Sequence, residues 1–206
     1  MEVSTSFLSN RNYVEVINEL NNTNTDYVHF DVMDGKFVNN KNLSISEVKN
    51  LIDICEKKKD IHLMVKDPSK YIDALALCDI DYITIHYEIK DYLKYIDMIK
   101  EYGFKIGVAI NPDTSIDKII PILKDINLVL IMGVVPGYSG QEFIDTSIDK
   151  INNLKEYIEK NKLNVKISVD GGINDSNIDL IKNSDICVSS SFILSDYRNI
   201  DIIKNM

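Results

Sequence analysis

Short hydrophobic segments alternate with amphipathic segments along the whole chain of 206 residues. The short segments are rich in Val, Ile, Tyr and Phe, as is typical of β-strands. We predict eight strands, over residues 2–8, 27–32, 61–65, 81–87, 105–110, 128–134, 165–170 and 185–188. Between them, apolar residues recur at helical spacing. We expect helices over about 11–22, 44–55, 90–102, 145–161 and 175–183, two more starting near 67 and 111, and a short last helix.

This alternation is the sequence pattern of parallel β-α-β units. Eight such units in a chain of this size indicate one domain, over residues 1–206, folded as a (β/α)8 TIM barrel. A doubly wound open sheet is the alternative, because periodicity alone does not distinguish a closed sheet from an open one. Segment 128–134 is apolar throughout, as expected of a strand buried on both faces.

Several residues mark where helices should begin and end. Ser44 or Ser46 can cap the second helix, and Asp67-Pro68 is a typical helix start. Gly103 stands where a helix commonly ends in a left-handed residue. Pro121 should interrupt or kink the helix that follows the fifth strand.

Composition and charge exclude several classes of protein. Hydrophobic residues make up 45% of the chain and charged residues 27%, which is ordinary for a globular protein. The net charge of −9, without a basic stripe, argues against binding to nucleic acid or to an anionic membrane. No apolar run reaches the length of about 18 residues that spans a bilayer. The three cysteines, Cys55, Cys78 and Cys187, lie far apart and indicate reduced thiols in a cytoplasmic protein.

The first candidate chemistry lies on the strand around residue 29. Successive strand side chains point to opposite faces, so His29 and Asp31 share one face, and the other carries Val28, Phe30 and Val32. A buried imidazole beside a carboxylate is costly unless something pairs with it. The pair could hydrogen-bond within a polar patch, or it could belong to a metal or acid–base site.

Other strand ends favour the second interpretation, because chemistry in a (β/α)8 barrel lies at the carboxyl ends of its strands. These ends carry His29, Asp31, His62 and Asp170. Two imidazoles and two carboxylates suit a divalent transition ion such as Zn²⁺, Fe²⁺, Mn²⁺ or Co²⁺, whereas Mg²⁺ or Ca²⁺ would favour more oxygen. We expect His86 to lie behind these ligands or at the rim.

Glycine-rich segments near the end of the chain suggest an anion site. Gly137 to Gly140 and Gly171-Gly172 stand just before predicted helices, where backbone amides can surround a phosphate. One such pair is weak evidence, since turns also need glycine. Two of them beside the serines 189–191, in late units of an acidic protein, favour phosphate.

Taken together, these residues resemble the ribulose-phosphate 3-epimerase family. The matching motifs are Ser6-Phe7-Leu8-Ser9, Val28-His29-Phe30-Asp31-Val32-Met33-Asp34-Gly35, Ile61-His62-Leu63-Met64-Val65, Ile85-His86, Asn111-Pro112, Pro136-Gly137-Tyr138-Ser139-Gly140-Gln141 with Phe143-Ile144, and Val169-Asp170-Gly171-Gly172. They cover nearly the whole chain in the right order, and the motif around Asp31 is highly specific.

The resemblance implies an isomerase that interconverts D-ribulose 5-phosphate and D-xylulose 5-phosphate through an enediolate, in the pentose phosphate pathway. It implies one divalent metal ion, with Zn²⁺ favoured, and Asp31 and Asp170 as both metal ligands and acid–base groups. His29 and His62 would complete the ligand set. Residues implied to contact the substrate or surround the metal are Ser6, Met33, His62, Met64, Met132, Gly137, Tyr138, Ser139, Gly140, Gly171, Gly172, Ser190 and Ser191. We expect a homo-oligomer acting on a small sugar phosphate.

The chain departs from the family pattern at several positions, although the four expected ligands are unchanged. Thr5 replaces a usual proline, Val38-Asn39-Asn40 replaces Val-Pro-Asn, and Ser190-Ser191 replaces Gly-Ser. Two alternative functions remain: 3-epimerisation of a six-carbon ketose phosphate such as allulose 6-phosphate, and a non-catalytic barrel that binds sugar phosphates. Retention of all four ligand positions argues against the second.

Overall fold

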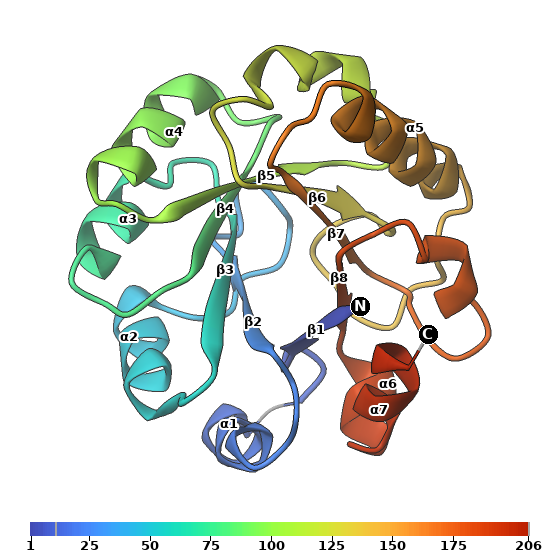
Figure 1. The fold of residues 1–206 in the computed structure, drawn as a ribbon. Helices are drawn as coiled ribbons and strands as arrows, with labels where there is room; N and C mark the ends of the chain where they lie inside the picture. The colour runs from blue at the N-terminus through green and yellow to red at the C-terminus, as the bar shows by residue number, and fades with distance from the viewer. Residues whose placement is uncertain (11, 206) are drawn as a thin grey trace.

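The computed structural model describes residues 1–10 and 12–205. Eight parallel strands pair in chain order, and β8 pairs with β1, so the sheet closes into a barrel (Figure 1). The strands are β1 (Glu2–Ser6), β2 (Tyr27–Met33), β3 (Lys58–Met64), β4 (Tyr82–His86), β5 (Lys105–Ile110), β6 (Leu128–Met132), β7 (Lys166–Asp170) and β8 (Ile186–Ser189). This closure confirms the predicted (β/α)8 barrel and excludes the open doubly wound sheet.

Helices surround the barrel on its outside (Figure 1). They are α1 (Tyr13–Asn21), α2 (Ile45–Ile54), α3 (Ser69–Leu75), α4 (Tyr92–Glu101), α5 (Thr146–Lys160), α6 (Ser191–Ser195) and α7 (Asn199–Lys204). The predicted start of the first helix, residue 11, lies outside the described residues. Ser44 caps α2 in a capping box with Glu47, and Gly103 follows α4 with a φ of +82°. Within residues 1–10 and 12–205, no helix is both long and apolar enough to cross a membrane.

Two of the predicted α-helices are wrong. After β5 the chain forms two 3₁₀ turns, η1 (Ile116–Lys118) and η2 (Ile120–Ile122), and Pro121, which lacks an N–H, lies in the second. After β7 it forms only η3 (Ile178–Ile181). There the side chain of Asn174 accepts a hydrogen bond from the Ser176 amide, a local bond that competes with helix formation.

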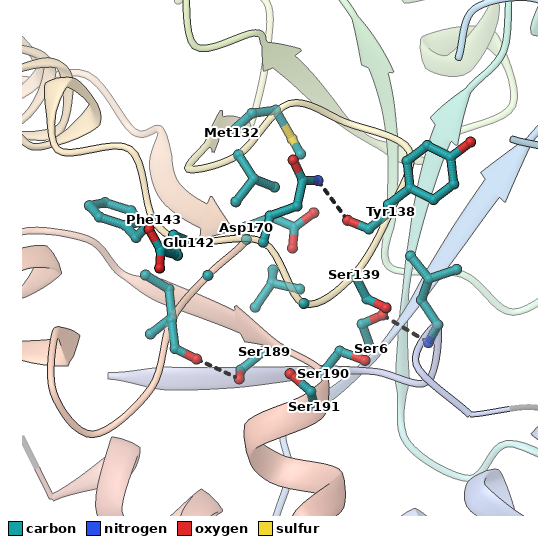
Figure 2. A pocket seen from close by; sticks show the side chains of 18 of the residues that line it. Ser6, Met132, Tyr138, Ser139, Glu142, Phe143, Asp170, Ser189, Ser190 and Ser191 are labelled. Carbon is teal, nitrogen blue, oxygen red and sulfur yellow. Dashed lines mark hydrogen bonds between the residues drawn. The ribbon is translucent and has the colours of Figure 1, made fainter. Parts of the chain in front are cut away.

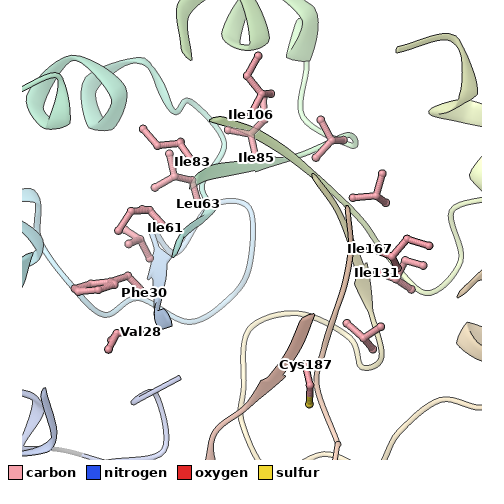
Figure 3. Close-up of a cluster of buried hydrophobic side chains, with 14 of the residues drawn as sticks. Val28, Phe30, Ile61, Leu63, Ile83, Ile85, Ile106, Ile131, Ile167 and Cys187 are labelled. Carbon is pink, nitrogen blue, oxygen red and sulfur yellow. The ribbon is translucent and has the colours of Figure 1, made fainter. Parts of the chain in front are cut away.

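Alternate strand side chains point outward and form the main hydrophobic core between the barrel and its helices. Figure 3 shows Phe30, Leu63 and Ile85 among them, and each is completely buried. A parallel strand covered by helices buries its outer face, which explains why Val, Ile and Leu dominate these positions. Val28, Phe30 and Val32 thus share the outward face, as predicted.

The other strand positions face the barrel axis, and the polarity of their side chains changes along this axis. One buried cluster in the interior is apolar and includes Tyr27, Tyr82, Leu128, Leu130 and Ile186. The remaining interior carries buried polar side chains, namely Ser4, Ser6, His29, Asp31, Asp60, His62, Thr84, His86 and Ser168. Buried polar side chains require hydrogen-bonding or ionic partners. These residues therefore indicate where a functional site lies in the barrel.

Candidate active site

The carboxyl ends of β2, β3 and β7 bring four candidate ligands together. One ligand atom from each of His29, Asp31, His62 and Asp170 lies within 4.8 Å of the others. Parallel pairing places Asp31 beside His62, because the two residues are in register between β2 and β3. Asp170 reaches the same place from the end of β7. All four residues predicted from the sequence as ligands are thus neighbours.

The geometry of these donor atoms fits a metal ion. His29 Nε2 and His62 Nδ1 lie 3.4 Å apart, and they lie 3.4 and 3.2 Å from Asp31 Oδ1. Asp170 Oδ2 is 3.9 Å from the first nitrogen and 3.7 Å from the second. Two ring nitrogens and two carboxylate oxygens around one small space match the ligand preference of divalent transition metals. The cluster could therefore hold such an ion.

The two carboxylates of the cluster have opposite pKa shifts. Burial would raise the pKa of Asp31, but the neighbouring imidazoles of His29 and His62 lower it well below its usual value. Burial, reinforced by the charge of Asp31, raises the pKa of Asp170 to about 7. Near neutral pH the cluster therefore combines an ionised carboxylate with one that readily holds a proton.

Two further carboxylates, which the sequence patterns did not single out, lie behind the histidines. Asp60 Oδ2 is 2.8 Å from His29 Nδ1, and strand pairing places the two residues opposite each other. His86 is completely buried, with its Nε2 2.9 Å from His62 Nε2 and its Nδ1 3.2 Å from a carboxylate oxygen of Glu88. Asp60 could have been found by the alternation along β3, since it stands two residues before His62.

Ser6 and the methionines surround the carboxylate end of the cluster. The Ser6 hydroxyl donates a 2.7 Å hydrogen bond to Asp31 Oδ2. Met64 and Met132 line the pocket that opens there, whereas Met33 is completely buried in a small cluster with Met64. Ser6, Met64 and Met132 can therefore contact a bound molecule, and Met33 supports them from within the protein.

A pocket of about 660 Å³ opens beside Asp31 and Asp170, at the carboxyl end of the barrel (Figure 2). Three loop segments form most of its wall, residues 136–143, 170–174 and 188–192. They contain every residue predicted for phosphate binding. Among the described residues that line this pocket, none is Lys or Arg. An anion bound there would depend on backbone amides and hydroxyl groups.

The glycines of this wall serve two different purposes. Gly140 has a φ of +76° and nothing within 4 Å of the place where a Cβ would stand. Gly172 has a φ of +73°, but a Cβ there would lie 2.5 Å from the backbone nitrogen of Phe143. Gly140 is thus required by its backbone conformation alone. Gly172 also allows the loops after β6 and β7 to pack backbone against backbone.

Ser190 joins the pocket wall to the loop after β1. Its hydroxyl oxygen lies 2.9 Å from the Ser9 hydroxyl and accepts a 3.2 Å hydrogen bond from the Ser9 amide. Glycine, the usual residue of the family that the sequence resembles, could not make this link. The departure noted in the sequence therefore adds a contact between the first and last units of the barrel.

Comparison with known proteins identifies the family. Residues 2–194 match the ribulose-phosphate 3 epimerase family. The chain belongs to this family. The ribulose-phosphate 3-epimerase of Bacillus subtilis (strain 168) is 37% identical over 167 residues, which span 80% of this chain and 77% of that enzyme. The enzyme of the same name from Methanocaldococcus jannaschii is 37% identical over 195 residues, spanning 93% of this chain and 82% of that enzyme.

The family assignment confirms the resemblance drawn from the sequence motifs and makes the chain an isomerase of the epimerase type. The epimerase barrel is also similar to solved structures of other enzymes. A mutant tryptophan synthase α-subunit from Pyrococcus furiosus matches it with a TM-score of 0.70, at 10% identity, over 98% of this chain and 94% of that chain. At such low identity the likeness shows the shared fold alone.

Proposed function

We propose that this epimerase interconverts D-ribulose 5-phosphate and D-xylulose 5-phosphate, with C3 of the sugar held between Asp31 and Asp170. The observation that carries the proposal is this pair of carboxylates, which line one pocket from two separate strands. They come from β2 and β7, which β8 and β1 separate around the barrel. The names of the relatives support the choice of substrate.

The chemistry requires two proton-transfer groups. The hydrogen on C3 is next to the ketone, and its removal leaves an enediolate. Inversion at C3 requires that a proton leaves one face of the sugar and another returns to the opposite face. Asp31 and Asp170 line the same pocket, so one can accept the proton that leaves C3 and the other can return a proton to the opposite face. The reverse reaction exchanges the two roles.

We assign a divalent metal ion to His29, Asp31, His62 and Asp170, with Zn²⁺ favoured over Fe²⁺, Mn²⁺ and Co²⁺. When bound, such an ion supplies positive charge that stabilises the negative charge developing on the substrate oxygens. Ser6 orients Asp31 by donating to Oδ2, which leaves Oδ1 directed toward the histidines. This hydrogen bond also ties β1 to β2 at the point where the chemistry occurs.

The substrate phosphate is assigned to the glycine-rich wall of the pocket. We expect the amides of residues 137–140, 171–172 and 190–191 to supply the donors, since no lining residue that the structure describes is basic. Backbone donors suit a phosphate in a protein with a net charge of −9, because they attract the anion without depending on cationic side chains. Asp31 and Asp170 line the same pocket, so a phosphate bound to this wall would leave the sugar carbons beside them.

The two-base assignment is tested by replacing each carboxylate with its neutral amide. In deuterated water, metal-loaded Asp31→Asn or Asp170→Asn should exchange the C3 proton of one epimer without inverting it. The other single variant should do the same for the opposite epimer, and the double variant for neither. NMR of the sugar C3 position measures this exchange, and turnover on ribulose and allulose phosphates measures the chain-length preference.

Metal content must be determined in each variant, because both carboxylates are also assigned as ligands. Loss of the ion would otherwise be mistaken for loss of a base. A metal-replete Asp170→Asn protein that epimerises at close to the wild-type rate would overturn the assignment. Binding of the sugar phosphate without turnover by wild-type protein would favour a non-catalytic barrel.

A further inference from the structure

The two histidines of the metal cluster face it with different ring nitrogens. His29 presents Nε2 and His62 presents Nδ1, and these atoms are 3.4 Å apart. A nitrogen binds a metal through its lone pair, so the proton of each neutral ring must be on the other nitrogen. His29 must therefore carry its proton on Nδ1, and His62 must carry its proton on Nε2.

Asp60 lies where it can select the required form of His29. Its Oδ2 is 2.8 Å from His29 Nδ1 and also accepts a hydrogen bond from the Ser4 hydroxyl at 3.2 Å. Asp60 is almost completely buried, and the structure gives its second oxygen no partner. An ionised carboxylate only accepts hydrogen bonds. Nδ1 must then be the donor, which leaves Nε2 of the same ring free to face the cluster.

The second histidine is controlled from further away, through His86. The nitrogen of His62 that faces away from the cluster, Nε2, is 2.9 Å from His86 Nε2. The other nitrogen of His86 is 3.2 Å from Glu88 Oε2. The remaining oxygen of Glu88, Oε1, accepts hydrogen bonds from the Asn111 amide and the Thr114 hydroxyl.

The direction of every hydrogen bond in this chain follows from Glu88. Because the carboxylate of Glu88 only accepts hydrogen bonds, His86 Nδ1 must be the donor, and His86 Nε2 then carries a lone pair. That lone pair requires a proton on His62 Nε2, which leaves His62 Nδ1 free toward the cluster. The opposite direction would place a lone pair of His86 against the carboxylate of Glu88.

We propose that Asp60 and Glu88 are positioning residues that hold the two metal-facing histidines in opposite tautomers, Asp60 acting directly on His29 and Glu88 acting through His86 on His62. The inference rests on the metal site proposed above. Phe37 packs against His86, with 4.5 Å between ring centroids, and helps to keep that ring in line. Neither carboxylate lines the pocket, so neither is assigned a contact with the substrate.

Glu88→Gln gives a sharp test, because its effect on the protons is predictable. The backbone N–H of Asn111 requires an acceptor, so the amide oxygen should take the place of Oε1 and the NH₂ group should face His86. His86 Nδ1 would then accept, and every hydrogen bond of the chain would reverse. The proton of His62 would move to Nδ1 and point into the cluster, while His29 would not change.

Protein labelled with ¹⁵N-histidine reports these positions directly, since the sequence has only three histidines. In Zn²⁺-loaded wild-type protein we expect N–H signals from His29 Nδ1 and His62 Nε2. In metal-free Glu88→Gln the His62 proton should appear on Nδ1. Zn²⁺ affinity, measured by competition with a chelator, should fall about 10- to 100-fold in Glu88→Gln and in Asp60→Asn.

Asp26→Asn is the matched control, because Asp26 precedes β2, outside the cluster, where it accepts a hydrogen bond from the Val3 amide and forms an ion pair with Lys204. Its Zn²⁺ affinity should equal that of wild type. Failure of wild-type protein to bind Zn²⁺ would overturn the metal site itself. Two outcomes would overturn the positioning roles alone. One is normal Zn²⁺ binding with the same nitrogen coordinated in both rings. The other is a Glu88→Gln protein in which the position of the His62 proton and the affinity for Zn²⁺ are unchanged.

Discussion

Replacing Gly172 with alanine should destabilise the protein far more than replacing Gly140, although the two backbone conformations are nearly the same. Their φ values are +73° and +76°, so the strain of an L-residue in the left-handed region is matched between the two variants. The surroundings differ. A Cβ at Gly140 meets nothing within 4 Å, whereas at Gly172 it would lie 2.5 and 2.8 Å from the N and Cα atoms of Phe143.

The magnitudes follow from these distances. Left-handed strain costs about 1–2 kcal/mol, and reduced freedom of the unfolded chain returns about 0.4–1 kcal/mol, so Gly140→Ala should lose about 1 kcal/mol. Backbone atoms of Phe143 cannot rotate aside as a flexible side chain would. Overpacking of this kind adds about 1–3 kcal/mol, so Gly172→Ala should lose about 2–4 kcal/mol in total.

Thermal unfolding of both variants measures the difference. For a chain of this length, each kcal/mol corresponds to about 2–4 °C in Tm, so we expect a shift of about 3 °C for Gly140→Ala and about 6–12 °C for Gly172→Ala. The displaced loop 141–143 should also raise KM for the sugar phosphate in Gly172→Ala. Equal Tm losses in the two variants would show that the loops do not pack backbone against backbone, and would refute the reasoning.

Three further predictions concern the metal, pH and Ser190. A strong chelator should abolish activity, and a divalent transition ion should restore it; full activity in metal-free protein would contradict the ligand assignment. In metal-free protein the pKa of Asp170 is about 7 in the folded state and close to the usual 3.8 in the unfolded chain, so between these values only the folded state keeps the proton. Stability from this group should therefore fall as pH rises through that window, and the pH dependence of Tm should be flatter in Asp170→Asn. Ser190→Gly should lower Tm by loss of the hydrogen bonds to Ser9 and leave KM unchanged or lower, whereas a large rise in KM would assign the hydroxyl to phosphate binding.

The fold could be predicted because two periodicities carry most of its information. Period-two alternation in strands such as β2 separates His29 and Asp31 from the outward Phe30, and the structure shows that separation. The rule that parallel strands end at one face of a barrel then placed Asp170 near them without any knowledge of contacts. These two arguments together predict all four candidate ligand positions, His29, Asp31, His62 and Asp170.

Pairing between strands and local side-chain bonding could not be predicted in the same way. β3 begins at Lys58, three residues before the predicted start, because the long partner strand β2 extends the pairing into charged sequence. Asp60 lies in that extension, so the predicted strand over residues 61–65 does not include it. Glu88 stands two residues after His86 but beyond the end of β4, so strand alternation alone does not predict that it contacts this histidine. The segment after β7 has helical spacing, but Asn174 and its neighbours bond to the backbone instead.

The positions of the four proposed ligands along the chain have a consequence for how the protein is assembled. His29, Asp31 and His62 belong to two adjacent strands in the first third of the chain, and Asp170 comes from the seventh strand. During synthesis three ligands are available long before the fourth, which arrives only when the last strands close on β1. An ion bound by all four ligands stabilises the closed ring selectively over any partly closed intermediate, by mass action. If the proposed ion binds, metal supply would then influence what fraction of newly made chains has a closed barrel.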